Sequence, residues 1–184
     1  MAVRHRGTDA VNEEHKGKIA MVSRRDAILG AGVVGAAMAA AAPALGQSVA
    51  APPVAPEHAR FAAEVAAAQD RLDAFMKAFN ARDIPAYEAT FNFPHVRFAS
   101  SKVTIINPGF HKPEMFTSGA LSDWDHSAWQ RRNVIHAGAD KVHIDTRFSR
   151  FRKDGSVIGG FDSMYIVTKQ DGHWGVKIRS SFAP

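Results

Sequence analysis

The 184-residue sequence contains no cysteine, which excludes disulfide bridges, thiolate metal sites and cysteine nucleophiles. It also lacks a phosphate-binding loop and a Gly-x-Ser-x-Gly elbow, so it carries neither of these signatures of nucleotide-binding proteins and serine hydrolases. The net charge is +5, but basic and acidic residues alternate, and no Lys/Arg block with interleaved aromatic residues occurs. We therefore expect no nucleic-acid partner.

The first 46 residues have the order of an export signal. A polar stretch leads to Ser-Arg-Arg-Asp at residues 23–26, and an apolar run rich in Gly and Ala follows without a charge. A basic segment, an apolar segment and a small-residue exit in this order are typical of a signal peptide. The arginine pair resembles a twin-arginine export signal, with Ala27 at the position where Phe is usual. The sequence therefore predicts a signal peptide with a polar N-terminal extension over residues 1–46.

Small residues at the end of this run predict cleavage near Ala44 to Gly46. The mature protein would then be periplasmic or otherwise exported, and it would meet the membrane only through its signal segment. One alternative is an uncleaved anchor, because the apolar run is close to the length that spans a bilayer. The true start also stays open, because Met21 lies two residues before the arginine motif.

Residues 47–60 are rich in Ala and Pro and predict a linker, followed by a folded domain over residues 61–184. At its start, apolar residues recur every three or four positions, which predicts an amphipathic helix; they are Phe61, Val65, Ala68, Leu72, Phe75 and Phe79. Asp83 is expected to cap a short second helix with Pro85 in its first turn.

The rest of the domain alternates between apolar and polar residues, as strands do. Asp-Gly pairs at 154–155 and 171–172 separate three long alternating segments and predict tight turns. A short helix is expected over 112–118, and strands are expected over 91–100, 103–106, 125–136, 141–152, 157–169 and 174–182. Helices followed by a run of strands predict an α+β fold with a mainly antiparallel sheet.

This element order resembles the nuclear transport factor 2-like, or SnoaL-like, superfamily. Local segments carry the same resemblance: Phe79 to Asp83 between the two helices, Tyr165 to Lys169 before the Asp-Gly-His-Trp turn, and Lys177 to Phe182. The resemblance extends from about Glu64 to the last residue. It implies a cystatin-like cone of helices packed on a curved sheet, with an internal pocket and no cofactor. Members of the superfamily include ketosteroid isomerases, polyketide cyclases, epoxide hydrolases, dehydratases and proteins with no activity, so a shared fold does not transfer chemistry.

The isomerases of this superfamily have a base carboxylate near the end of the first strand. The corresponding position here is close to Ala99, which carries no base. A second acid of the isomerases corresponds roughly to Asp162 or Met164. The resemblance therefore implies that at most half of the isomerase site is present.

His95 and Arg97 share one face of the first predicted strand with Phe91 and Phe93, so they point inward if these rings face the core. A buried cation needs a partner, and Asp162 is a candidate. One interpretation makes His95 and Asp162 a catalytic acid–base pair, with Arg97 holding an anionic group. The other makes Arg97 and Asp162 a structural ion pair and His95 a satisfied polar contact.

Three further residues are candidates for binding a substrate or ligand. Tyr87 on the short helix either donates a hydrogen bond into the pocket or has its hydroxyl in water, and the sequence leaves both open. Trp129 can line the pocket, and Met164 belongs to the strand that carries Asp162. Buried Trp residues are also common in ordinary cores, so the core interpretation stays open for Trp129.

His143, Asp145 and Arg147 alternate on one predicted strand and therefore share a face. A metal site would need His126 or His136 in addition, because a metal usually takes three or more ligands. The alternative is a solvated or dimer-facing sheet surface. We expect no metal ion and a homodimer formed through the sheet.

Two functions are compatible with these patterns. The first is an exported SnoaL-like domain that binds a small apolar or ring-containing molecule in its cone without turnover. The second is a cofactor-independent isomerase, lyase or hydrolase that uses the His95–Asp162 pair. The sequence alone leaves open whether the protein is an enzyme.

Overall fold

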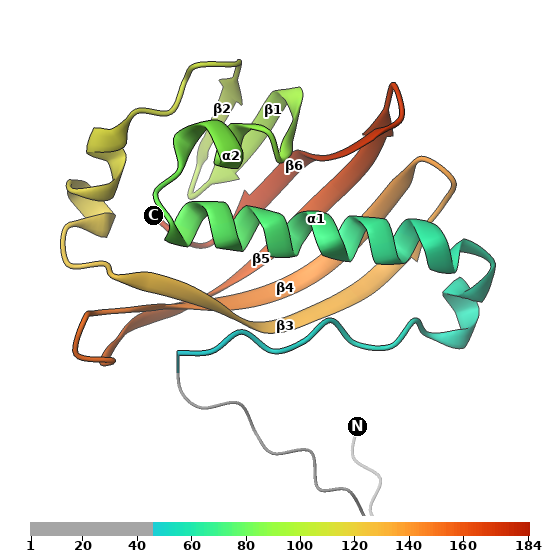
Figure 1. Ribbon diagram of the computed structural model, residues 1–184, viewed down its shortest axis with the longest axis horizontal. Coiled ribbons are helices and arrows are strands. Elements are labelled where there is room, and N and C mark those ends of the chain that lie inside the picture. Colours follow the sequence, from blue (N-terminus) through green and yellow to red (C-terminus); the bar gives the residue numbers. More distant parts are fainter. Residues whose placement is uncertain (1–45) are drawn as a thin grey trace, which may run out of the picture. The chain divides into compact units, whose positions relative to one another are not determined.

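The computed structural model describes residues 46–184, and Figure 1 shows how their helices and strands are arranged. The predicted signal peptide lies outside the described residues, apart from Gly46. In chain order the elements are η1 (Pro56–Phe61), α1 (Ala62–Asn80), α2 (Ile84–Glu88), β1 (Phe91–Ala99), β2 (Lys102–Ile106), η2 (Pro113–Phe116), η3 (Gly119–Leu121), β3 (His126–Ala137), β4 (Lys141–Phe151), β5 (Val157–Gln170) and β6 (His173–Ser181), where η denotes a 3₁₀ helix.

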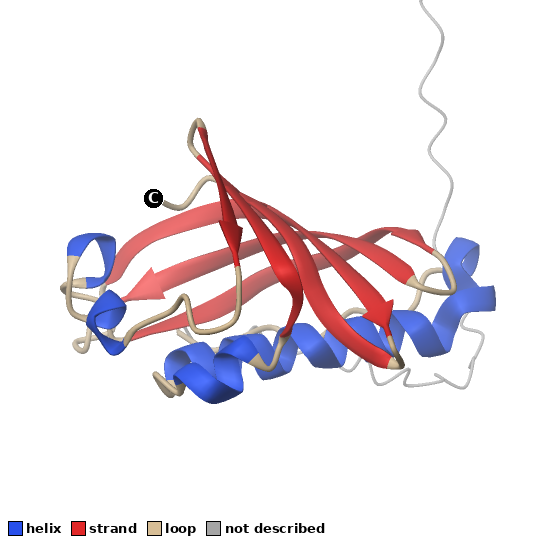
Figure 2. Cartoon of the chain, turned by 90° about the horizontal axis from the view of Figure 1, so that it is seen from above, coloured by secondary structure: helices blue, strands red, loops and turns tan. Residues whose placement is uncertain are grey.

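The six strands form one mixed sheet in the order β2-β1-β6-β5-β4-β3. Strands β1 and β6 are parallel, and every other neighbouring pair is antiparallel. The sheet is open, with β2 and β3 at its edges. Helix α1 lies across one face and contacts the four strands β3 to β6, and the sheet curves over it in the view of Figure 2. The prediction of an α+β fold with helices packed on a curved, mainly antiparallel sheet is confirmed.

The two helices form where the sequence predicts them. The apolar stripe of α1 is buried against the sheet, with Leu72 and Phe75 near its centre. The helix begins at Ala62 because η1 occupies the preceding residues. In α2 the side chain of Asp83 accepts a hydrogen bond from the backbone N–H of Ala86 at 2.9 Å, which satisfies one of the free donors at a helix start.

The long strands also agree with the predicted pattern to within one or two residues. Asp171 and Gly172 both have positive φ, as a two-residue turn between twisted antiparallel strands requires. The short helix predicted over 112–118 is present only as the 3₁₀ helix η2, and a second 3₁₀ helix, η3, follows it. Each of the two has only three or four residues.

Part of the predicted linker over 47–60 packs against the domain. The N–H of Val49 donates to the Trp129 carbonyl at 2.9 Å, and the Trp129 N–H donates to the Ser48 hydroxyl at 3.0 Å. The Val49 side chain also packs on the core. This segment therefore runs along the edge of β3. Within residues 46–184, none of the helices has the length and apolar character needed to cross a membrane.

Candidate functional site

A cavity of about 490 Å³ lies between the helices and the sheet, a size typical of small-molecule sites. Helices α1 and α2, strands β1, β2, β4 and β6, and the segment 107–121 all contribute to its wall. The apolar part of this wall is largely aromatic and includes Phe79, Tyr87, Phe91, Ile106, Phe110 and Leu121. The interior of the predicted cone is therefore present as a space lined by rings.

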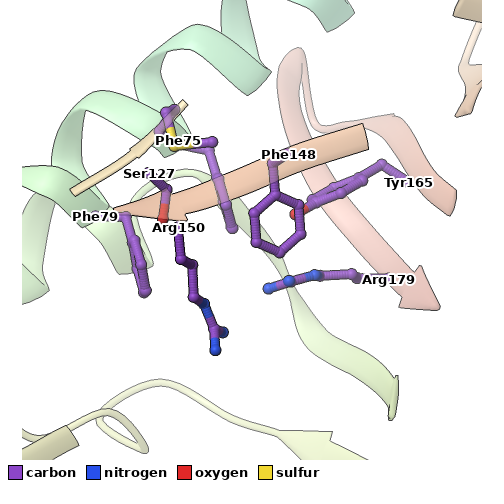
Figure 3. Close-up of a pocket in the computed structure, with 8 residues that line it drawn as sticks. Phe75, Phe79, Ser127, Phe148, Arg150, Tyr165 and Arg179 are labelled. Carbon is purple, nitrogen blue, oxygen red and sulfur yellow. The ribbon is translucent and has the colours of Figure 1, made fainter. Parts of the chain in front are cut away.

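A smaller space of about 20 Å³ adjoins the cavity, and Figure 3 shows the side chains around it. We call this space the inner recess. It has room for about one water molecule. Phe79, Arg150 and Arg179 line both the cavity and the inner recess, so the two arginines stand where the spaces meet. Tyr165 and Ser127 are polar side chains at the wall of the inner recess.

Two arginines on the cavity wall, Arg150 and Arg179, have no carboxylate partner among the described residues. Arg97, on the same wall, donates to a main-chain oxygen of Pro184 at 3.2 Å and to the Ala183 carbonyl at 3.3 Å. Arg150 donates weakly to a single carbonyl at 3.5 Å, and Arg179 donates to the Ser181 hydroxyl at 3.2 Å. The buried Nε atoms of Arg150 and Arg179 have no hydrogen-bond partner among residues 46–184.

These buried positive charges are only partly compensated by aromatic rings. Burial, together with the neighbouring charges of Arg179 and Arg97, lowers the pKa of Arg150 to about 10. The Arg179 guanidinium lies 5.4 Å from the centroid of the Tyr165 ring, a cation–π distance. An unpaired buried cation destabilises the fold, and guanidinium groups bind carboxylates with matching geometry. The wall therefore carries positive charge that the described residues only partly compensate.

His95 and Tyr87 add two neutral polar groups to the same cavity. The His95 Nδ1 lies 3.1 Å from the Val176 carbonyl oxygen, which can only accept, so Nδ1 carries the proton. Burial lowers the pKa of His95 to about 4, and the ring is therefore neutral at pH 7. Burial also raises the pKa of Tyr87, which keeps its hydroxyl protonated and able to donate. The structure thus brings the predicted residues His95, Arg97 and Tyr87 together.

Asp162 is not part of this site, so the predicted His95–Asp162 pair is wrong. Its carboxylate contacts Arg131 at 3.0 Å and Arg147 at 2.8 Å, on the face of the sheet that points away from the cavity. The neighbouring Ser163 points inward and bonds to another buried hydroxyl. Because side chains alternate along β5, an inward Ser163 forces Asp162 outward. The ion pair proposed between Arg97 and Asp162 is wrong for the same reason.

Met164 and Trp129 also lie away from the cavity wall. Met164 points outward, as Asp162 does, because its neighbours Ser163 and Tyr165 in β5 are buried and side chains alternate along a strand. Trp129 is fully buried, packs on Phe75 and borders neither the cavity nor the inner recess. It is a core residue, so its predicted role in ligand binding does not fit the structure.

The outward face of the sheet carries a network of ion pairs. His143, Asp145 and Arg147 share this face, and Asp145 binds Arg131 at 2.8 Å. Across residues 46–184, no three His, Asp or Glu side chains come together in a way that would hold a metal ion. The solvated-surface interpretation therefore fits better than the metal interpretation.

Two parts of the site were not predicted from the sequence. Arg150 and Arg179 occupy inward positions of their strands, and alternation alone marks them as inward-facing cations. Glu88, at the end of α2, binds His111 across 23 residues of sequence, and the cavity wall includes His111. A contact of this kind depends on how the segment after β2 folds back, so no local pattern indicates it.

Comparison with known proteins places the chain in a family. A family model described as "NTF2-like protein (DUF6841)" matches residues 63–181, and the chain belongs to this family. No curated protein matches the sequence.

Solved structures show the same fold at low identity. A ketosteroid isomerase-like protein from Erwinia carotovora is 20% identical with a TM-score of 0.51, and the match covers 65% of this chain and 95% of that one. An NTF2-like protein with a cystatin-like fold from Novosphingobium aromaticivorans is 7% identical with a TM-score of 0.57, over 69% and 86% of the two chains. A cystatin-like protein of unknown function from Nostoc punctiforme is 12% identical with a TM-score of 0.56, over 67% and 92%.

Proposed function

We propose that this domain binds a small ring-containing molecule that carries an anionic group, such as an aromatic carboxylate. The observation that carries this proposal is the pair of cavity arginines, Arg150 and Arg179, that lack a carboxylate partner in the described chain. The anionic group binds between Arg150 and Arg179, at the junction with the inner recess. The ring packs on Phe79, Tyr87 and Phe91, whose faces form the apolar wall.

The charge of the wall sets this proposal apart from binding of a purely apolar molecule. An uncharged ligand would leave the Nε atoms of Arg150 and Arg179 without partners and the positive charges uncompensated. A carboxylate supplies several acceptor positions in one rigid group, and it can bridge two guanidinium groups. Aromatic walls with a few charged groups that fix orientation are usual for small-molecule sites.

The first prediction compares an aromatic carboxylate with its neutral analogue. Naphthoate should bind at least about tenfold more tightly than naphthamide by titration calorimetry, because charged hydrogen bonds to arginine contribute about 1.5–3 kcal/mol. Arg179→Met should remove this preference, since it removes one of the two guanidinium groups at the proposed anion position.

Arg147→Met serves as the matched control for this prediction. Arg147 lies on the outward face of the sheet and pairs with Asp162, so its loss should leave the preference for naphthoate unchanged. Equal affinities for naphthoate and naphthamide would contradict the proposal. An equal loss of preference in the Arg147 and Arg179 variants would contradict it as well.

We also propose that the chain is exported, because Ser-Arg-Arg precedes its apolar N-terminal run. The second prediction is that the periplasmic fraction contains a chain that begins near Ala44 to Gly46. Replacing both Arg24 and Arg25 with Lys should keep the uncleaved chain in the cytoplasm. N-terminal sequencing of both fractions checks this, and cleavage and export that persist in the Lys variant would argue against a twin-arginine signal.

A homodimer through the sheet is part of the same proposal. Val103 and Ile105 on the edge strand β2 are 60% and 64% exposed, and Phe98 beside them on β1 is 43% exposed. Exposed apolar residues grouped on one sheet face are common at protein interfaces. Sedimentation velocity on the unmodified chain would show a monomer if this part of the proposal is wrong.

A further inference from the structure

The cavity wall contains a histidine–carboxylate pair that ligand binding alone does not use. Glu88 Oε1 lies 3.0 Å from His111 Nδ1 and accepts the backbone N–H of His111 at 3.0 Å. Glu88 Oε2 accepts the backbone N–H of Gly109 at 2.7 Å. Both side chains of the pair are largely buried. Glu88 therefore fixes both the position of the His111 ring and the loop that carries it.

We propose that His111 is a general base in this cavity and that Glu88 is its positioning residue. The substrate class is a ring-containing carbon acid whose negative charge develops on an oxygen, and this rests on the proposed function because the arginines hold that oxygen. His111 lines the same cavity as Arg150 and Arg179, whereas Glu88 binds the Nδ1 of the ring and does not line the cavity. A base held in position in the same cavity as anion-stabilising groups is what proton abstraction requires.

The hydrogen bonds determine which nitrogen of His111 acts. An ionised carboxylate only accepts, so Nδ1 carries the proton of the neutral ring and Nε2 has the free lone pair. Among residues 46–184, no hydrogen bond occupies Nε2. When Nε2 takes a proton, the imidazolium that forms is stabilised by the adjacent negative charge of Glu88.

Glu88 stays ionised although it is partly sheltered. Burial opposes its ionisation, but the backbone N–H groups of Gly109 and His111 and the imidazole together lower its pKa. Burial lowers the pKa of His111, the carboxylate of Glu88 opposes this shift, and the charge of Arg97 on β1 adds to it. The ring also stacks on Phe91 and meets the Tyr87 ring edge-on. His111 is therefore neutral and ready to accept a proton at pH 7.

His95 is the weaker candidate for the same role, although it borders the same cavity. Its Nδ1 donates to a neutral backbone carbonyl, and its pKa is about 4. A base with so low a pKa takes a proton only weakly. His111 has a carboxylate partner to stabilise its charged form, whereas His95 has none in the described chain.

The step needs no co-reactant. Nε2 of His111 takes the proton of a C–H bond, and the electron pair of that bond forms a new double bond. The charge then reaches an oxygen, either a carbonyl oxygen that becomes an oxyanion or a leaving oxygen whose bond breaks. Arg150 and Arg179 stabilise this oxyanion. The imidazolium afterwards returns its proton to the product or to water.

Nitrobenzisoxazole is a suitable probe, because a base converts it by this same step. Its C–H proton is removed, a nitrile forms, the N–O bond breaks and a coloured phenolate appears. We expect the full chain to accelerate this reaction, with a rate that rises with pH and levels off above the lowered pKa of His111. His111→Gln should reduce kcat/KM at least about 100-fold, within the usual range for a lost general base.

Glu88→Gln tests the positioning role through the pH profile. The carboxylate raises the pKa of His111, so an amide in its place should move the inflection to lower pH and reduce the plateau rate. A purely structural contact would not move this inflection. Thermal unfolding and naphthoate titration of both variants check that the fold and the proposed ligand site remain.

The pair Asp125 and His126 provides the matched control. His126 Nδ1 lies 2.9 Å from an Asp125 oxygen, and neither residue lines the cavity. His126→Gln should leave the rate unchanged. The proposal is overturned if the unmodified chain gives no acceleration, if His111→Gln keeps the wild-type rate, or if His126→Gln loses as much. If naphthoate still binds in any of these cases, the base proposal fails while the binding proposal stands.

Discussion

Replacing Arg150 with Met is expected to make the unliganded protein more stable, by about 1–3 kcal/mol in the free energy of unfolding. Arg150 is buried, its Nε has no partner in the described chain, and its one weak hydrogen bond is 3.5 Å long. Apolar residues of similar volume often stabilise a protein when they replace buried charges. Met keeps most of the packing of the arginine stem and removes the repulsion from Arg179 and Arg97.

Urea denaturation measures this change as a higher midpoint at an unchanged slope. Naphthoate should stabilise the wild-type chain and not the variant, because a ligand shifts unfolding only as far as it binds the folded state. Without naphthoate the variant should thus be the more stable of the two proteins, and with naphthoate the wild type should be the more stable. A site that is destabilising when empty and useful when occupied follows the usual trade-off between stability and function.

Arg132→Met is the contrasting variant. Arg132 is also buried, but its guanidinium pairs with Asp73 and donates to the Val49 carbonyl at 3.1 Å. Its loss should lower the free energy of unfolding by about 1–3 kcal/mol, because charged hydrogen bonds are broken and their partners lose their donor. If Arg150→Met destabilises the protein as Arg132→Met does, Arg150 has a structural role and the anion-binding proposal loses its main support.

The sequence predicts most of the fold because the fold depends on local periodicity. The stripe that includes Leu72 and Phe75 defines the buried face of α1, and Asp83 begins α2 through one short hydrogen bond. The turn at Asp171 and Gly172 sets the register between β5 and β6. Each of these signals involves residues close together in the chain.

Local periodicity does not determine which side chains of β5 point toward the core. Asp162 and Met164 alternate with Ser163 and Tyr165, and either set is compatible with an inward face. The choice is made by contacts with other strands: Ser163 bonds to Ser181, and Asp162 pairs with Arg131 from β3. A one-residue error in phase moves every side chain of a strand to the other face.

The site residues that were not predicted depend on distant contacts in the same way. The inward position of Arg179 follows from alternation along its strand. The absence of a carboxylate partner for it among residues 46–184 follows only from the arrangement of all the strands. Likewise, Glu88 and His111 come together because the segment after β2 returns toward α2. The sequence analysis paired His95 with Asp162, whereas the fold pairs His111 with Glu88, so both the histidine and the acid differ from the prediction.

Acidification should unfold the protein partly through His95, and the effect should be about 3 kcal/mol between pH 7 and pH 4. Burial lowers the pKa of His95 to about 4 in the folded state, against an ordinary value of 6.5. Between these two values the unfolded chain binds the proton and the folded chain does not. Stability therefore falls as the pH decreases through this window, by about 1.4 kcal/mol for each unit of pKa difference.

The variant His95→Asn isolates this contribution. Its side-chain amide can still donate to the Val176 carbonyl, but it does not titrate. Groups that do not interact with position 95 contribute equally to the two pH profiles and cancel in the difference, whereas the charge of His111 acts on His95 and is part of the measured effect. From pH 7 to pH 4 the wild type should therefore lose about 3 kcal/mol more free energy of unfolding than the variant. Urea midpoints of both proteins at the two pH values measure this difference. If both proteins lose stability in parallel, water or a counter-charge reaches His95 in the folded state. Burial would then not be what keeps the His95 ring neutral at pH 7.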